Sequence, residues 1–332
     1  MDYGLNRKAI ALLSGGLDST LAVRIVQEQG IEVEAVNFQT MFTCCKNDAR
    51  RVAHDLGVRL TVLEVGDDYL KVIQKPKYGY GRGMNPCVDC RIYMFLAAKQ
   101  TMESTGAAFL VTGEVLDQRP KSQKMNDFRI IEEQSGLEGK ILRPLSAKLL
   151  PETEAERNGL IDREKLYAVH GQSRKLLLEL AVKYGIDNPP PASPGCALTM
   201  EGFAKKVKDV FDHRPDYQRW EFEILKVGRH FRLDADTKAV IGRSHEQNEY
   251  LEVLHPAGTT LLRCKNFGGP HGLIIGNANQ ENLNKAGALV LRYAQKPLPL
   301  ICEFETRSHE GTGHLAMSGE IQEELVESLR IV

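Results

Sequence analysis

Short apolar runs alternate with amphipathic segments between Lys8 and Val111. Buried strands are predicted for residues 9–13, 31–38, 59–65 and 108–111. Helices are predicted for residues 17–29, 47–56 and 88–105. Strands separated by helices form βαβ units, so we expect an α/β domain whose parallel sheet is covered by helices on both faces. Such sheets bind their ligands at the carboxyl ends of the strands.

The second half of the chain has a different pattern. A helix is predicted for residues 171–184, and the prolines between Asn188 and Gly195 favour an extended connection. Beyond Trp220, short strands are predicted for residues 231–233, 239–241, 259–263, 272–275 and 298–304, with a helix over residues 282–294. We therefore predict a first domain of residues 1–200, in which residues 140–200 form a connecting segment. A second, smaller α+β domain is predicted for residues 220–332.

The composition is that of an ordinary globular protein. Of the 332 residues, 42% are hydrophobic and 26% are charged, and the formal net charge is -1. Any contact with nucleic acid must therefore use a local basic surface. No apolar stretch has the length of a signal peptide core or a membrane span. Seven cysteines without an export signal are typical of a reducing compartment, so we expect a cytoplasmic protein.

A glycine-containing turn, Ser14–Ser19, follows the first predicted strand and begins the first predicted helix. Gly15 and Gly16 allow the backbone to approach a ligand closely. The serine hydroxyls and the amides of the helix N-terminus suit a polyphosphate. The turn lacks the lysine of a Walker A loop and does not match the Gly-x-Gly-x-x-Gly fingerprint. A nucleotide site of another kind is therefore predicted.

The sequence Ser-Gly-Gly-Leu-Asp-Ser resembles the PP-loop of ATP pyrophosphatases with a Rossmann-like fold. That superfamily includes GMP synthetase, asparagine synthetase and the tRNA-thiolating enzymes. The resemblance implies that ATP is cleaved between its α- and β-phosphates, which yields an adenylated substrate and pyrophosphate. It further implies that Asp18 helps to hold Mg²⁺. The nucleotide-binding residues would be Ser14, Gly15, Gly16, Asp18, Ser19, Asn37, Phe38 and Gly113.

Three cysteines are candidates for a second kind of chemistry. Cys87 and Cys90 form a Cys-x-x-Cys motif at the start of a predicted helix, and Cys196 follows the proline cluster. A structural zinc needs four ligands, and the adjacent Cys44 and Cys45 are the remaining candidates to complete such a site. Three cysteines can instead hold a [4Fe-4S] cluster with one open iron. Alternatively, Cys196 carries a persulfide that Cys90 resolves as a disulfide.

The segment Asn-Pro-Cys-x-x-Cys, following a PP-loop and accompanied by a distant third cysteine, resembles the tRNA 2-thiouridylases and 4-thiouridine synthetases over about residues 7–210. The similarity is greater to the branch that uses the three cysteines as iron–sulfur ligands. It implies that Cys87, Cys90 and Cys196 bind a [4Fe-4S] cluster, and that Asp18, Cys90 and Cys196 are catalytic. The second interpretation of these three cysteines is that they are thiols that carry and transfer a persulfide. Pro-Gly-Cys-Ala around Cys196 stands where that family has a turn richer in glycine.

The C-terminal part resembles the NFACT RNA-binding domain in residues 231–233, 241–251 and 271–275. The resemblance implies that this domain contacts RNA; the alternative is an accessory domain for packing or dimerisation. Candidate phosphate-binding residues are Arg229, Arg232, Arg243, Arg263 and Lys265. In the first domain, the loop from Lys71 to Arg82 combines cations with tyrosines, and it suits either a flap over RNA or a wall around the cysteines.

These observations favour an ATP-dependent tRNA sulfurtransferase. The enzyme would adenylate a uridine carbonyl and replace its oxygen with sulfur, giving 2-thiouridine or 4-thiouridine. Its partners would be tRNA and a sulfur donor, either sulfide or a persulfide carrier, and a homodimer is compatible with the sequence. One alternative is a PP-loop ligase or thiolase that uses ATP on a small molecule. Another is an RNA-binding module with a degenerate nucleotide site, against which the intact loop and cysteine pair argue.

Overall fold

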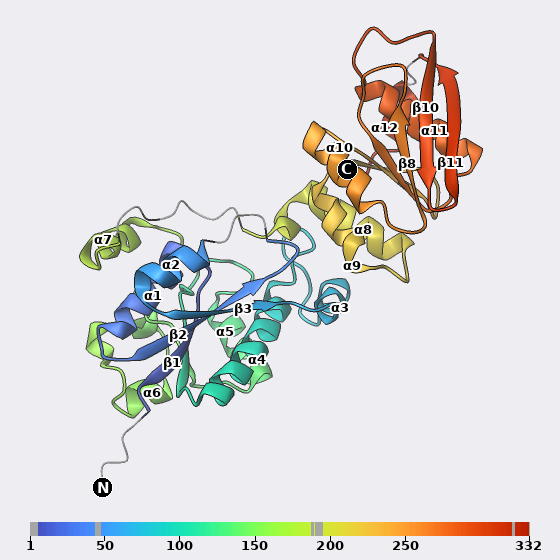
Figure 1. The fold of residues 1–332 in the computed structure, drawn as a ribbon. Helices are drawn as coiled ribbons and strands as arrows, with labels where there is room; N and C mark the ends of the chain where they lie inside the picture. The colour runs from blue at the N-terminus through green and yellow to red at the C-terminus, as the bar shows by residue number, and fades with distance from the viewer. Residues whose placement is uncertain (1–5, 44–47, 187–188, 190–194, 321–322, 332) are drawn as a thin grey trace. The chain divides into compact units, whose positions relative to one another are not determined.

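The chain forms two compact units, Met1–Thr199 and Met200–Val332. The computed structural model describes residues 6–43, 48–186, 189, 195–320 and 323–331. Each unit is built around one β-sheet (Figure 1). Within the ranges described, no helix has both the length and the apolar character needed to cross a membrane.

The first unit contains a parallel sheet of five strands in the order β3-β2-β1-β4-β5 (Figure 1). Its strands are β1 (Lys8–Leu12), β2 (Glu32–Gln39), β3 (Arg59–Glu64), β4 (Phe109–Thr112) and β5 (Ile141–Leu142). The central strand is β1, in which Ala9 pairs with Val33 on one side and with Phe109 on the other. This order brings the carboxyl ends of β1, β2 and β4 to one edge of the sheet.

Helices cover both faces of this sheet. They are α1 (Leu17–Gln27), α2 (Ala49–Leu56), α3 (Asp68–Gln74), α4 (Cys87–Thr105), α5 (Met125–Ser135), α6 (Glu154–Arg157) and α7 (Lys175–Lys183). Short 3₁₀ helices span Ala147–Leu149, Arg163–Lys165 and Ala197–Thr199. Ala9 packs in one apolar cluster with Leu21 of α1, and Ile10 packs in another with Phe95 of α4 and Ile131 of α5. Successive side chains of β1 are therefore buried on opposite faces, which explains its continuous apolar run.

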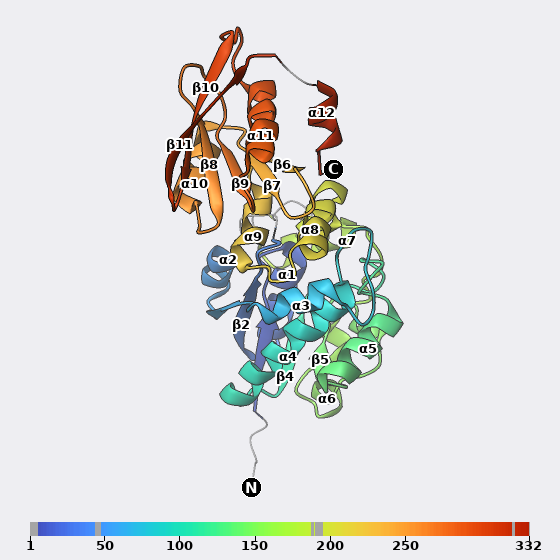
Figure 2. The same ribbon diagram turned by 90° about the vertical axis from the view of Figure 1, so that its right-hand side faces the viewer.

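The second unit contains an antiparallel sheet of six strands in the order β11-β10-β8-β9-β7-β6 (Figure 2). Its strands are β6 (Arg229–Arg232), β7 (Lys238–Ile241), β8 (Thr259–Cys264), β9 (Gly272–Ile275), β10 (Ile301–Ser308) and β11 (Gly311–Ser318). Its helices are α8 (Glu201–His213), α9 (Arg219–Glu223), α10 (His245–Leu254), α11 (Gln280–Tyr293) and α12 (Glu323–Ser328), with a 3₁₀ helix at Ile224–Lys226. Leu289 of α11 packs against the sheet in a cluster with Phe231 and Phe304.

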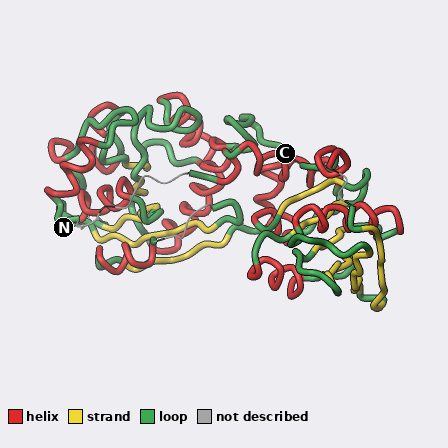
Figure 3. Tube along the Cα trace, turned by 90° about the horizontal axis from the view of Figure 1, so that it is seen from above, coloured by secondary structure: helices red, strands yellow, loops and turns green. Residues whose placement is uncertain are grey.

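The structure confirms the predicted classes of both domains: a parallel α/β sheet and a separate, smaller α+β unit (Figure 3). The strand predicted for residues 298–304 is β10, and it forms a hairpin with β11, which was not predicted. Only Leu315 of the eight residues in β11 is buried, so this edge strand has no apolar alternation to detect. Helices α8 and α10 and the two-residue β5 were also missed. The second unit begins at Met200 and so includes α8.

Candidate active site

The turn Ser14–Ser19 joins β1 to α1 at the carboxyl edge of the parallel sheet. Gly15 has a φ of +80°, and a Cβ atom there would lie 2.7 Å from the backbone nitrogen of Ala49. Gly16 is the N-cap of α1 and offers no side-chain cap to the helix amides. The turn therefore keeps its backbone close-packed on one side while the uncapped N-terminus can face an anion on the other.

Hydroxyl groups within the turn hold its shape. The Oγ atoms of Ser14 and Ser19 are 3.1 Å apart. Ser19 Oγ and Thr20 Oγ1 each donate a hydrogen bond to the carbonyl oxygen of Gly16 at 2.9 Å. These hydrogen bonds connect the side chains of the loop to its own backbone and stabilise its conformation.

The turn after β4 packs closely against the loop Ser14–Ser19. A Cβ atom on Gly113 would lie 2.4 Å from the carbonyl carbon of Asp18, so no side chain fits at this position. On the β2 side, Asn37 Nδ2 donates to the carbonyl oxygen of Leu13 at 2.7 Å. These contacts bring the ends of three neighbouring strands together.

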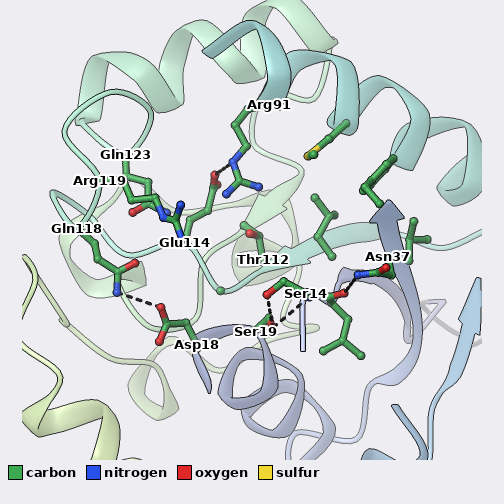
Figure 4. A pocket seen from close by; sticks show the side chains of 16 residues that line it. Ser14, Asp18, Ser19, Asn37, Arg91, Thr112, Glu114, Gln118, Arg119 and Gln123 are labelled. Carbon is green, nitrogen blue, oxygen red and sulfur yellow. Dashed lines mark hydrogen bonds and ion pairs between the residues drawn. The ribbon is translucent and has the colours of Figure 1, made fainter. Parts of the chain in front are cut away.

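A cavity of about 170 Å³ lies at this edge of the sheet (Figure 4). Six residues that the sequence analysis assigned to the nucleotide line it: Ser14, Asp18, Ser19, Asn37, Phe38 and Gly113. Gly15 and Gly16 shape the loop but are not among the lining residues. The structure thus gathers most of the predicted nucleotide site around one cavity.

Side chains from α4 and from the segment after β4 also line the cavity, and sequence reasoning did not assign them to the nucleotide. They are Arg91, Met94, Gln118, Arg119 and Gln123. Glu114 is buried, and its two carboxylate oxygens lie 3.3 Å from Arg91 Nε and 3.1 Å from Arg143 Nε. No local motif links these three residues, because they meet only through the order of the strands. Two signals were available: Arg91 directly follows the Cys-x-x-Cys motif, and Glu114 directly follows Gly113 in the turn that the resemblance places beside the nucleotide.

The cavity has a cationic side and an acidic side. Gln118 Nε2 donates to Asp18 Oδ2 at 3.0 Å, which orients this carboxylate beside the loop (Figure 4). Desolvation, followed by repulsion from Arg91, lowers the pKa of Arg119, while the charges of Cys87 and Asp18 act in the opposite direction. A phosphate between the two arginines would relieve their repulsion. Arg119 also connects this cavity electrostatically to Cys87.

Cys87 and Cys90 lie in the first turn of α4, and each sulfur accepts a hydrogen bond from a neutral side chain. Asn85 Nδ2 donates to Cys87 Sγ at 3.0 Å, and Tyr69 Oη donates to Cys90 Sγ at 3.0 Å. Burial raises the pKa of the Cys90 thiol, and the Tyr69 hydrogen bond and the Arg91 charge oppose this shift. The two donors would stabilise sulfur that carries negative charge.

Cys196 approaches this pair from a distant part of the chain. Its Sγ lies 3.7 Å from the carbonyl oxygen of Phe42, and its backbone forms an antiparallel bridge with Thr43. Burial raises the pKa of Tyr69 well above its usual value, and the charges of Cys90, Cys196 and Cys87 raise it further. Cys90 therefore contacts the buried Tyr69 hydroxyl, and the charges of Cys87 and Cys196 also act on that hydroxyl.

The described geometry gives no support to a metal centre at these cysteines. Over the part of the chain that the structure describes, no three histidine, cysteine or acidic side chains are grouped as metal ligands. Two of the sulfurs face the hydrogen-bond donors of Asn85 and Tyr69. The expected [4Fe-4S] cluster therefore has no support from this arrangement. Cys44 and Cys45 lie outside the described residues.

Two family matches agree with the resemblances inferred from the sequence. Residues 4–148 match the family described as thiamine biosynthesis protein (ThiI). Residues 228–328 match the NFACT protein RNA binding domain. Both resemblances are confirmed.

Several known proteins are similar to this chain. A tRNA-specific 2-thiouridylase MnmA of Syntrophotalea carbinolica is 33% identical over 121 residues, which cover 32% of this chain and 34% of that protein. The MnmA of Caldicellulosiruptor saccharolyticus is 28% identical over 279 residues, covering 76% and 73% of the two chains. A solved 4-thiouridine synthetase in complex with RNA and ATP has 21% identity and a TM-score of 0.36, over 65% of this chain and 53% of that one. The chain spans about a third of the length of the first curated relatives it matches.

Proposed function

We propose that this chain is an ATP-dependent tRNA sulfurtransferase. The proposal is supported by the ThiI-type segment, by the similarity to proteins named as tRNA thiouridylases, and by an RNA-binding-type second unit. One observation carries it. Arg91 lines the nucleotide cavity and directly follows Cys90 on α4, so an adenylation site and a set of thiols adjoin each other on one helix.

In the first step, the carbonyl oxygen of a uridine attacks the α-phosphorus of ATP. The bond between the α- and β-phosphates breaks, and pyrophosphate leaves. The uncapped amides of α1 and the guanidinium groups of Arg91 and Arg119 are the donors positioned to stabilise the developing negative charge. Asp18, oriented by Gln118, is the carboxylate suited to hold Mg²⁺, which neutralises phosphate charge when it is bound.

In the second step, sulfur replaces the activated oxygen. A persulfide on Cys196 attacks the uridine carbon through its terminal sulfur, and AMP leaves. The Cys90 thiolate then attacks the Cys196 sulfur, so that the persulfide bond breaks, the thiouridine departs and a Cys90–Cys196 disulfide forms. Sulfide attacking this disulfide at Cys196 restores both the persulfide and the Cys90 thiolate without an external reductant. With a persulfide carrier as the donor, a dithiol reductant must reduce the disulfide.

Tyr69 contributes to this exchange as a hydrogen-bond donor. Its hydroxyl faces Cys90 at 3.0 Å, so it can stabilise the thiolate that attacks Cys196. The thiols suit the reducing cytoplasm, which we propose as the location. The homodimer, the identity of the sulfur donor and the ligation of a cluster by Cys87, Cys90 and Cys196 stay predictions.

The proposal is tested by mass spectrometry of tRNA nucleosides from a deletion strain. Loss of one thiouridine is expected, and the wild-type chain should restore it. Asp18→Asn should restore at least about a hundredfold less, because it removes the carboxylate beside the phosphates. Asp55→Asn, which changes an exposed carboxylate on α2, is the matched control and should restore the nucleoside fully. An unchanged nucleoside profile in the deletion strain would contradict the proposal, and ATP–pyrophosphate exchange without RNA would favour the small-molecule ligase.

A further inference from the structure

Three cations of the second unit lie together with no carboxylate to neutralise them. They are Lys206 of α8, Arg229 of β6 and Arg243, which precedes α10. Arg229 Nη1 lies 3.4 Å from the carbonyl oxygen of Gly242, which directly precedes Arg243, and Lys206 Nζ donates to the carbonyl oxygen of Leu225 at 3.2 Å, four residues before Arg229. The Arg243 charge also contributes to lowering the pKa of Lys206 and of Arg229. None of the three forms an ion pair with any acidic residue that the structure describes. We name Lys206, Arg229 and Arg243 the cation cluster.

Two of the other basic residues proposed from the sequence, Arg232 and Arg263, are already neutralised. Arg232 Nε lies 3.0 Å from Asp209 Oδ1, and Arg263 lies 2.9 Å from Glu252. Arginines held by a neighbouring carboxylate have less net charge to offer a phosphate. Of the five predicted basic residues, Arg232 and Arg263 are therefore paired, Arg229 and Arg243 belong to the cation cluster, and Lys265 follows the end of β8.

The aromatic ring of Tyr293 packs against the side chain of Arg229. The Arg229 guanidinium lies over the Tyr293 ring at 4.1 Å from its centre, and the Arg292 guanidinium is 5.8 Å from the same centre. Arg330 donates a hydrogen bond to the Tyr293 hydroxyl at 2.8 Å. The ring is thus occupied by arginines, so it serves to hold Arg229 in place and not to stack on a nucleobase.

Burial and a helix N-terminus also act on the cluster. Burial, and to a smaller extent the Arg243 charge, lowers the pKa of Lys206 to about 8. Arg243 immediately precedes the N-cap of α10, and the positive end of that helix adds to the field. Arg330, near the C-terminus, forms an antiparallel β-bridge with Phe231 of β6. Figure 2 shows this end of the chain beside α8. An anion at the cluster would offset the repulsion among its members.

We propose that Lys206, Arg229 and Arg243 bind the sugar-phosphate backbone of RNA. The proposal rests on the proposed function, which makes tRNA the partner. Guanidinium and ammonium groups without acidic neighbours match phosphate oxygens, and no free aromatic face in the cluster is available to recognise a base. The contact should therefore be independent of RNA sequence. Lys206 lies outside residues 228–328, so the site extends the matched RNA-binding domain by α8.

The test measures binding of a fluorescent, unmodified tRNA transcript to the full chain at several salt concentrations. Lys206→Gln, Arg229→Gln and Arg243→Gln should each weaken binding about five- to tenfold near 0.1 M salt. Each should also lower the slope of log affinity against log salt by about 0.7 to 1. Arg263→Gln removes the same charge from a paired position and is the matched control, with less than a twofold change expected. Because Arg229 packs on Tyr293, Arg243→Glu at an exposed position provides a variant whose folding is not at risk.

The outcomes separate this site from the proposed enzymatic activity. If the wild-type chain thiolates tRNA but Arg243→Glu binds tRNA as tightly as the wild type, the cation cluster is not the RNA site. Equal losses in Arg243→Gln and Arg263→Gln would also overturn the proposal. If the cluster variants lose affinity as expected while the wild-type chain transfers no sulfur, the site stands and the proposed function fails. A 20-nucleotide RNA of unrelated sequence should show the same ratio of affinities as the transcript.

Discussion

Cys87, Cys90 and Cys196 have unequal roles if sulfur moves as a persulfide. Cys90→Ser and Cys196→Ser should each lower thiouridine formation by about three or more orders of magnitude, because each removes one member of the disulfide pair. Cys87→Ser should retain measurable activity, since Cys87 does not form that disulfide. All three variants should still release pyrophosphate. The measurements are thiouridine per chain with sulfide as the donor, and pyrophosphate release.

A cluster at these residues would produce a different result. It would give about four irons per chain in protein purified without oxygen, and each of the three substitutions would remove the iron and the activity equally. Cys264→Ser in the second unit is the control, and it should change neither readout. Iron that is lost in all three variants would overturn the persulfide route.

Individual site residues were predictable where they follow a local pattern. Asn37, Phe38 and Gly113, which the PP-loop resemblance assigned to the nucleotide, all line the cavity, and they lie at or just beyond the ends of predicted strands. Gln118 and Arg119 follow no such pattern, because the segment that holds them reaches the loop only through tertiary contacts such as that with Asp18.

At the level of elements, β7 buries a lysine beneath α8 and α9. Lys238 is 1% exposed, and its Nζ has no hydrogen-bond partner among the described residues. Desolvation lowers its pKa to about 8, although the charges of Asp209 on α8 and Glu221 on α9 act in the opposite direction. The unfolded chain, with its lysine near the usual value of 10.5, therefore binds this proton more tightly than the folded chain between about pH 8 and 10.5. The free energy of unfolding of this unit should rise as the pH increases through that window.

This pH dependence can be followed through Trp220, the single tryptophan of the chain, which lies in α9. Urea unfolding monitored by its fluorescence at pH 7, 8, 9 and 10 should show the rise. The Lys238→Met variant should have a higher free energy of unfolding than the wild type at pH 7, because the buried charge is gone. Its free energy of unfolding should also rise less with increasing pH. Asp209 and Glu221 keep their partners Arg232 and Arg214 in this variant. Lys265→Met, at an exposed position, should keep the wild-type dependence. Parallel curves for both variants would refute the assignment.

Elements were predictable to different degrees for physical reasons. The strand β1 and the helix α1 combine a buried apolar run with a glycine turn, so the local pattern was sufficient. A signal existed for α8 as well, since Ala204, Val207 and Val210 are its buried residues at helical spacing. For β11 the sequence held no such signal, because β11 is mostly exposed and forms a strand through its backbone pairing with β10.

At the scale of the whole molecule, nucleotide and RNA contacts are proposed for different units. Arg243→Glu should weaken tRNA binding without changing the affinity for ATP. Asp18→Asn should leave the dissociation constant for tRNA within about twofold of the wild type, and the double variant should bind tRNA like Arg243→Glu alone. Titration of tRNA and of ATP against the four proteins provides the measurement. A loss of tRNA affinity in Asp18→Asn would mean that the two contacts are not independent.

Cys90 and Arg91 are consecutive residues of α4, a helix of 19 residues. A helix does not bend between adjacent positions, so the backbone keeps these two residues at a fixed separation during a turnover. In the proposed reaction the uridine therefore has to come to the site beside these residues, and a uridine stacked inside an RNA helix does not reach it. The proposed reaction therefore requires the base to flip out of its stack. The choice of nucleotide would then follow from how easily each uridine leaves the folded tRNA, so that the architecture of the RNA and not its letters determines the position that is modified.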